Sequence, residues 1–248
     1  MPKFRSVVLA IGIAILSIGM ILVVNPNSAI AQNHHHHEIS PADLPTEVRN
    51  LTADEVSAER LVNQGLEKMQ QGQYENAIAD FTQAVQLNPN HDAAYFKRGD
   101  TYRKLGQYQA AIADYTQAIQ HNPTFSDLYN TRGQARELVG DYKGAIEDYT
   151  MGIKLYPEDA IGYSHRGGVY YQLGEMKKAM RDLNTAIQLN PSRAEAYLNL
   201  GKVYTKLGDI AQALANYQTA VNMYSQQGKV VDYIRTSNLV KSIELQQR

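Results

Sequence analysis

The sequence predicts an all-α protein built as a stack of helix pairs. A 16-residue segment recurs at a constant interval of 34 residues, with no insertion between copies. Glycine, alanine and proline hold fixed places in the interval, and large apolar side chains recur between them at helical spacing. The copies are YENAIADFTQAVQLNP at 74–89, YQAAIADYTQAIQHNP at 108–123, YKGAIEDYTMGIKLYP at 142–157, MKKAMRDLNTAIQLNP at 176–191 and IAQALANYQTAVNMYS at 210–225.

Five units align without a gap when position 1 is placed at residues 58, 92, 126, 160 and 194. Two positions carry only the smallest side chains, as the close approach of two helices requires. Position 8 is always glycine and position 20 is always alanine: Gly65, Gly99, Gly133, Gly167 and Gly201, then Ala77, Ala111, Ala145, Ala179 and Ala213.

Other repeated residues predict where each helix begins and ends. Position 15 is glycine in all five units, where a left-handed residue can end one helix and turn the chain into the next. Position 32 is proline in four units and closes the second helix. Large residues at positions 4, 17 and 24 fit the spaces beside the small ones. Each unit therefore forms two antiparallel helices, and neither can bury its apolar stripe without the neighbouring unit.

A 34-residue unit with these residues, together with a small residue at position 27, resembles the tetratricopeptide repeat (TPR) family. The resemblance covers residues 58–225 and rests on five copies in register. It implies a right-handed superhelical solenoid of five TPR helix pairs, whose first helices line a concave groove. In this family the groove generally holds a peptide, a partner helix or another protein.

Both ends of the repeat array, predicted to span 52–225, differ from the pattern in ways that suit caps. Residues 52–55 form a capping-box sequence that should start the first helix ahead of the repeat boundary. Ser225 replaces the closing proline of the fifth unit. In the segment 226–248, Val230, Tyr233, Val240 and Ile243 recur at near-helical spacing, so we expect a C-terminal capping helix over the last repeat.

The N-terminal segment 1–31 has the three parts of an export signal. Lys3 and Arg5 precede an uncharged apolar run at 7–24, and small residues end the segment before Gln32. We expect cleavage after Ala31 and export to a periplasm, a lumen or the extracellular space; the alternative is an uncleaved membrane anchor. Residues 32–51 suit a flexible polar linker, and the histidine run at 34–37 is interpreted as a polar spacer, with binding of a transition metal as the alternative.

Composition and motifs exclude several classes of function. The 24 Lys and Arg residues balance 25 Asp and Glu residues, so no overall charge favours nucleic acid. Without cysteine there is no disulfide, thiol nucleophile or cysteine-bound metal. His91, His121 and His165 lack metal-ligand spacing, and Ser164 lies within a repeat helix rather than in a nucleophile turn. We therefore expect no enzyme activity, no cofactor and no metal site.

One charged pattern recurs inside the units. In the second, third and fourth units position 7 is arginine and position 23 is aspartate, whereas the first unit has Gln64 with Asp80 and the fifth has Leu200 with Asn216. This favours ion pairs within each unit, because arginine on a packed stripe needs a carboxylate partner. A pairing between the aspartate of one unit and the arginine of the next is the alternative. The expected pairs within units are Arg98–Asp114, Arg132–Asp148 and Arg166–Asp182.

A helical wheel with position 4 facing the core turns positions 2, 5, 6, 9, 12 and 13 outward, and these are the candidate groove. Apolar side chains at such positions in the first two units predict the main recognition patch, flanked by basic residues that would select an amphipathic segment with acidic residues at its edge. The alternative is that Leu44 and Val48 fold back over the patch. The candidate peptide-binding residues are Val62, Leu66, Phe96, Lys97, Asp100, Arg103, Lys104, Asn130 and Gln134.

These features predict an exported, non-enzymatic adaptor that binds a protein or peptide segment in its groove, in the assembly or stabilisation of an envelope or luminal complex. Some TPR proteins grip a terminal carboxylate with Lys, Asn and Arg at set positions in three consecutive units. No three consecutive units match that set here. The alternative function is a carbohydrate-binding or enzyme-accessory protein of the envelope, which would need stacked exposed aromatic rings beside amides.

Overall fold

The computed structural model describes residues 52–246, and this part of the chain consists of eleven α-helices with no strand. The prediction of an all-α superhelical solenoid is confirmed. In chain order the helices are α3 (Ala53–Gln70), α4 (Tyr74–Leu87), α5 (Asp92–Lys104), α6 (Tyr108–His121), α7 (Ser126–Leu138), α8 (Tyr142–Leu155), α9 (Ala160–Gln172), α10 (Met176–Leu189), α11 (Ala194–Leu207), α12 (Ile210–Gln226) and α13 (Val230–Gln246).

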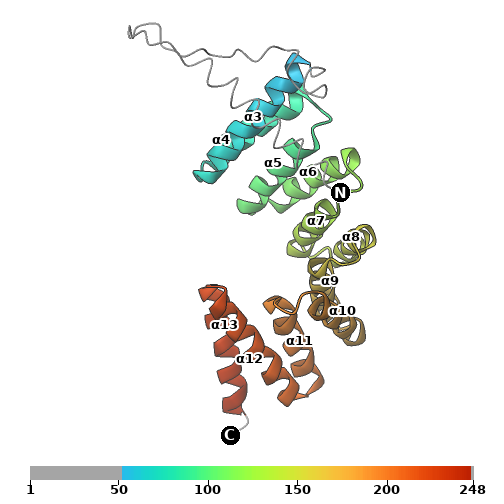
Figure 1. Cartoon of the computed structure of the whole chain (residues 1–248), viewed down its shortest axis with the longest axis vertical. Coiled ribbons are helices and arrows are strands. Elements are labelled where there is room, and N and C mark those ends of the chain that lie inside the picture. The colour runs from blue at the N-terminus through green and yellow to red at the C-terminus, as the bar shows by residue number, and fades with distance from the viewer. Residues whose placement is uncertain (1–51, 247–248) are drawn as a thin grey trace, which may run out of the picture.

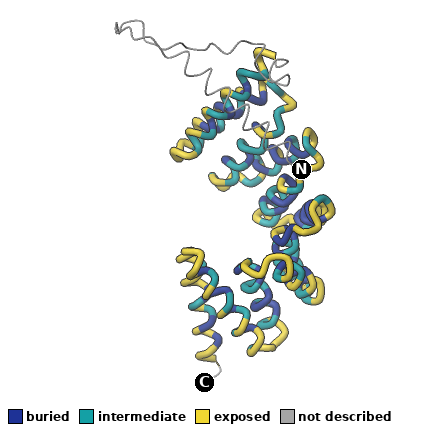
Figure 2. The backbone as a smooth tube through the Cα atoms, viewed as in Figure 1, coloured by how far each residue is buried: buried dark blue, intermediate teal, exposed yellow. Residues whose placement is uncertain are grey.

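The helix pairs follow an arc (Figure 1). Helices α5, α7, α9 and α11 lie on its inner side, and α6, α8 and α10 lie on its outer side. Buried residues run through the middle of the stack, whereas the turns and helix ends are exposed (Figure 2). The core is therefore continuous from one pair to the next, as expected for units that cannot bury their apolar faces alone.

Large side chains of the second helices pack against the glycines of the first helices. A Cβ atom placed on Gly201 would lie 2.6 Å from the ring of Tyr217, and one on Gly133 would lie 2.8 Å from the ring of Tyr149. Both tyrosines are almost fully buried. This confirms the predicted contact between positions 8 and 24, and it explains why a larger residue cannot stand at position 8.

The turns within the pairs lie where the glycines of position 15 predict them. Gly72 has φ of 77° and Gly106 has φ of 74°, a left-handed conformation that glycine adopts without steric cost. The prolines of position 32 follow the end of the second helix in four of the pairs. Helices α4, α6, α8 and α10 each end two residues before their proline.

The arginines and aspartates of the second, third and fourth units form ion pairs within their own unit, so the alternative pairing between units is excluded for these three pairs. Arg98 donates to both carboxylate oxygens of Asp114, at 2.8 and 2.7 Å, and also to the hydroxyl of Thr82 in the preceding unit at 3.1 Å. Arg132 and Arg166 repeat this arrangement with Asp148 and Thr116, and with Asp182 and Thr150.

The N-terminal end of the stack closes itself with polar residues. Thr52 and Glu55 form the predicted capping box, so α3 has 18 residues. Positions 3, 7 and 10 of the first helix, which would face a preceding unit, carry the exposed Arg60, Gln64 and Glu67. These three positions therefore present a polar surface at this end of the described residues. The predicted signal, the linker, the histidine run, Leu44 and Val48 all lie outside the described residues.

The C-terminal end is covered by α13, as expected, but with a different set of side chains. Because Ser225 replaces proline, α12 continues to Gln226, beyond the point where the other second helices end. Thr236, Val240 and Ile243 are the buried residues of α13. The expectation that Val230 and Tyr233 face the last repeat is wrong: they are 63% and 40% exposed, and the residues of α13 that pack begin at Thr236.

Candidate functional site

The candidate site is the inner surface formed by the first helices of successive units. Helices α3 and α5, α7 and α9, and α9 and α11 contact each other directly, without a second helix between them. First helices also pack against their own second helix, and from the second unit on against the second helix of the preceding unit, so several of their sides are covered. This leaves a narrower exposed strip than a wheel with one packed face predicts.

Packing between neighbouring helices buries part of the predicted recognition patch. Val62 is only 4% exposed and belongs to the core cluster of the first unit, so the expectation that it faces solvent is wrong. Leu66 is half-buried against the same cluster. Phe96 is also half-buried, with its ring 5.8 Å from that of Tyr115. Leu66 and Phe96 thus combine a packing role with a surface that a partner can reach.

The polar residues of the patch surround Phe96 and the end of α5. Lys97 Nζ lies 5.0 Å from the centre of the Phe96 ring. Asp100 accepts a hydrogen bond from the Tyr115 hydroxyl at 2.9 Å, and Arg103 lies 3.7 Å from the same carboxylate. Asp100 is thereby engaged within the protein, which leaves the patch with a surplus of positive charge.

The two cations at the rim of the patch differ in exposure and in their neighbours. Lys104 is exposed, with Nζ 5.9 Å from the centre of the Tyr74 ring. Arg103 is half-buried, and its Nε has no hydrogen-bond partner among the described residues. Both side chains lie in the last turn of α5, where the helix dipole favours positive charge.

Asn130 and Gln134, the two predicted site residues of α7, have different surroundings. Asn130 is 4% exposed and donates to Asp159 at 2.5 Å, while Asp159 accepts from the first backbone N–H groups of α9. The expectation that Asn130 lines the groove is wrong, because it ties α7 to the start of α9. Gln134 is half-buried, with Nε2 3.4 Å from His165 Nε2.

Three further residues with shifted pKa values lie on the first helices of the last three units. Burial raises the pKa of Glu137, which accepts a hydrogen bond from the Tyr149 hydroxyl at 3.1 Å. Burial and then Arg193 lower the pKa of His165 to about 4, and its ring stacks on that of Tyr149. Burial lowers the pKa of Lys202. The wheel placed these positions outward, but no sequence signal distinguished them from solvated residues.

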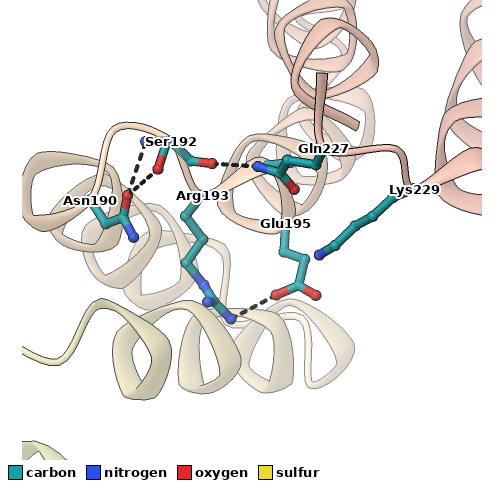
Figure 3. A pocket seen from close by; sticks show the side chains of 7 residues that line it. Asn190, Ser192, Arg193, Glu195, Gln227 and Lys229 are labelled. Atoms are coloured by element: carbon teal, nitrogen blue, oxygen red, sulfur yellow. Dashed lines mark hydrogen bonds and ion pairs between the residues drawn. The ribbon is translucent and has the colours of Figure 1, made fainter. Parts of the chain in front are cut away.

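A polar pocket lies at the turns that precede α11 and α13 (Figure 3). Arg193 forms an ion pair with Glu195 at 2.6 Å, and Gln227 donates to the carbonyl oxygen of Ser192 at 3.0 Å. The second contact connects the turn before α11 to the turn before α13. The polar groups of the pocket thus contact one another.

Neither a metal site nor a membrane span is found in the part of the chain that the structure describes. No group of three or more His, Asp or Glu side chains in residues 52–246 is arranged to hold a metal ion. Within the same residues, every helix is too short or too polar to cross a bilayer.

Models of tetratricopeptide repeats match three stretches of the chain. The matches cover residues 62–126, 167–208 and 194–227, and are described as tetratricopeptide repeat, TPR repeat and tetratricopeptide repeat. No curated protein matches the chain.

Several solved structures share the fold. MamA is 24% identical with a TM-score of 0.62, and the match covers 70% of this chain and 94% of MamA. YrrB, a TPR protein with an unusual peptide-binding site, is 18% identical with a TM-score of 0.59, over 75% of this chain and 94% of YrrB. PilF of Pseudomonas aeruginosa is 17% identical with a TM-score of 0.60, over 79% of this chain and 92% of PilF. Because these sequences are so different, the matches show that the proteins share a fold and show nothing more.

Proposed function

Because the chain belongs to the tetratricopeptide repeat family, we propose that it is a non-enzymatic adaptor that binds a protein or peptide segment along its inner surface. TPR proteins are generally adaptors of this kind, and the similar fold of YrrB carries a peptide-binding site. The inner surface offers a strip of half-buried residues that runs through all five units.

The observation that carries this proposal is the composition of the patch on α3 and α5. Leu66 and Phe96 are apolar, reachable side chains at its centre, and such groups gain free energy when a partner covers them. Lys97, Arg103 and Lys104 surround them, while Asp100 is held by Tyr115. The partner segment is therefore amphipathic, with acidic residues along its edge.

The place of action follows from the sequence of residues 1–31. A basic end, an apolar run and small residues before Gln32 support export to a periplasm, a lumen or the extracellular space. There the protein would help to assemble or stabilise an envelope or luminal complex, either released after cleavage or held by an uncleaved N-terminal anchor. N-terminal sequencing of the exported protein tests this, since a start at Gln32 supports cleavage and retention of Lys3 supports the anchor.

The binding proposal is tested by capture of partners from the native compartment with purified protein. Lys104→Glu reverses an exposed charge of the patch, and Lys177→Glu makes the same change on the outer helix α10. We expect the first change to reduce capture of the partner by about tenfold and the second to leave it unchanged. Equal capture by both variants would place the binding surface elsewhere.

A further inference from the structure

The patch on α3 and α5 carries positive charge that the surrounding helices leave unpaired. Asp100 is held by the Tyr115 hydroxyl at 2.9 Å. Within residues 52–246, no carboxylate lies within 4.0 Å of the ammonium group of Lys97 or of Lys104. Beside these lysines, Phe96 exposes part of its ring. An occupant that fits the patch therefore combines apolar side chains with carboxylates.

The chain itself contains a segment of this composition, directly before α3. Residues 38–51 read EISPADLPTEVRNL and carry three carboxylates against a single arginine. Two of these carboxylates stand next to apolar residues, since Asp43 precedes Leu44 and Glu47 precedes Val48. The segment thus has the charge and the apolar side chains that the patch selects.

Helices α3 and α5 run side by side in the same direction, so a distance along one applies to the other. Near their starts, His91 Nε2 lies 3.0 Å from a carboxylate oxygen of Glu59. Near their ends, the Thr101 hydroxyl donates to the sulfur of Met69 at 3.3 Å. Lys104 follows Thr101 by nearly one turn, so it lies at the end of the patch that is remote from the start of α3.

The segment is long enough to reach both ends of the patch. Leu66 lies 14 residues after Thr52, which is about 21 Å along α3. Gln70, the last residue of α3, lies about 27 Å from Thr52. Leu44 precedes Thr52 by eight residues, and an extended chain that turns back at Thr52 covers about 26 Å over that length. The apolar and acidic residues of the segment can therefore lie over the patch.

We propose that residues 38–51 occupy the patch of their own chain, with apolar side chains over Leu66 and Phe96 and carboxylates beside Lys97 and Lys104. The inference rests on the proposed function, because it makes the segment a competitor of the partner for one surface. A segment joined directly to α3 has an effective concentration at the patch on the order of 1 mM, which favours its own chain over a second copy. A partner has to displace the segment, and this lowers the apparent affinity for the partner.

The test uses two introduced cysteines in the purified full chain, which has no cysteine of its own. One variant combines Ala42→Cys in the segment with Gln70→Cys, an exposed position at the end of the patch. The matched control combines Ala42→Cys with Ala79→Cys, an exposed position on α4, the other helix of the first unit. After mild oxidation, free thiols are alkylated, and the intact mass gives the fraction of molecules with a disulfide within one chain. Thermal melting of the reduced variants confirms their folding.

We expect the disulfide between positions 42 and 70 to form about fivefold faster than that between positions 42 and 79 at low ionic strength. Lys104→Glu should slow the first reaction about threefold, and the further change Asp43→Lys should restore its rate, because the two charges then attract again. Equal rates for the two pairs, or a rate that does not respond to Lys104→Glu, would overturn the inference. A disulfide-linked dimer as the main product would overturn it too, because it places the segment on a second copy.

Capture of the partner separates this inference from the proposed function. The oxidation rates are measured without a partner, so their failure leaves the proposed function standing. Protein locked by the disulfide between positions 42 and 70 should capture about tenfold less partner than the same protein after reduction. Equal capture by the locked and reduced forms would overturn the competition. No capture by the reduced form or by the unchanged protein would overturn the proposed function, while the contact measured by oxidation would stand.

Discussion

Arg98 and Asp114 are joined by two hydrogen bonds across the helices of the second unit, and Arg98 also reaches Thr82 of the first unit. The pair thus holds a helix hairpin together and fastens it to its neighbour. The side chain of Arg98 is 15% exposed and that of Asp114 is 7% exposed. Each charge is therefore stabilised mainly by the other and little by water. The fifth unit shows that the fold can replace the pair by Leu200 and Asn216.

Removing one member of this pair should destabilise the protein more than removing both. Arg98→Leu leaves Asp114 buried without a cation and should cost about 2–4 kcal/mol of unfolding free energy. The double variant Arg98→Leu with Asp114→Asn reproduces the side chains of the fifth unit and should recover at least half of that loss. Urea denaturation measures both, and a double variant less stable than the single one would contradict the structural role of the pair.

Enlarging a buried alanine should separate two helices. Ala111 is fully buried on α6, and Ala111→Leu should cost about 1–3 kcal/mol through overpacking. Ala113→Leu is the matched control, because it makes the same change at an exposed position of the same helix. Equal shifts in melting temperature would show that the register of α6 is wrong.

Restoring proline at the end of the fifth unit should damage the C-terminal cap. Ser225 lies inside α12, so Ser225→Pro removes a helical N–H and strains the preceding turn, at a cost of about 3 kcal/mol. Ser225→Ala keeps the helix and should be nearly neutral. Hydrogen exchange of α13 reports the damage, and unchanged protection in Ser225→Pro would show that the cap does not depend on the longer α12.

His165 should make the stability depend on pH in the acid range. Its pKa is lowered from 6.5 to about 4, so the folded state favours the neutral ring. The stability that this provides is present above pH 6.5 and is lost as the pH falls toward 4, on the order of 2–3 kcal/mol. Urea midpoints at several pH values should fall less steeply in His165→Gln; parallel slopes would mean that His165 does not titrate in this window.

The sequence predicts the repeat geometry well because the contacts within a unit depend on the sizes of residues at fixed spacing. Positions 8 and 24 are 16 residues apart in every unit, so the contact between Gly133 and Tyr149 follows from the repeat and from helix periodicity. The predicted groove fails at Val62 and Asn130 for the opposite reason. Their burial comes from the next first helix, and the angle between neighbouring units is set by many contacts together.

The cap shows a similar limit. Val230 and Tyr233 have the spacing of a packed face but are exposed, and spacing alone does not tell which turns of α13 reach the last repeat. Lys202 could not be distinguished from a solvated lysine, because the residues that affect its pKa, Glu137 on α7 and Arg235 on α13, are distant in sequence.

The most direct test of the inner surface as the binding site is photo-crosslinking in the native compartment. A photoreactive amino acid is placed at Ala93 on α5 or at Ala113 on α6, two exposed alanines on the inner and outer helices of the same unit. We predict a discrete crosslinked partner from position 93 and none from position 113. Crosslinks from position 113 alone would contradict binding along the inner surface.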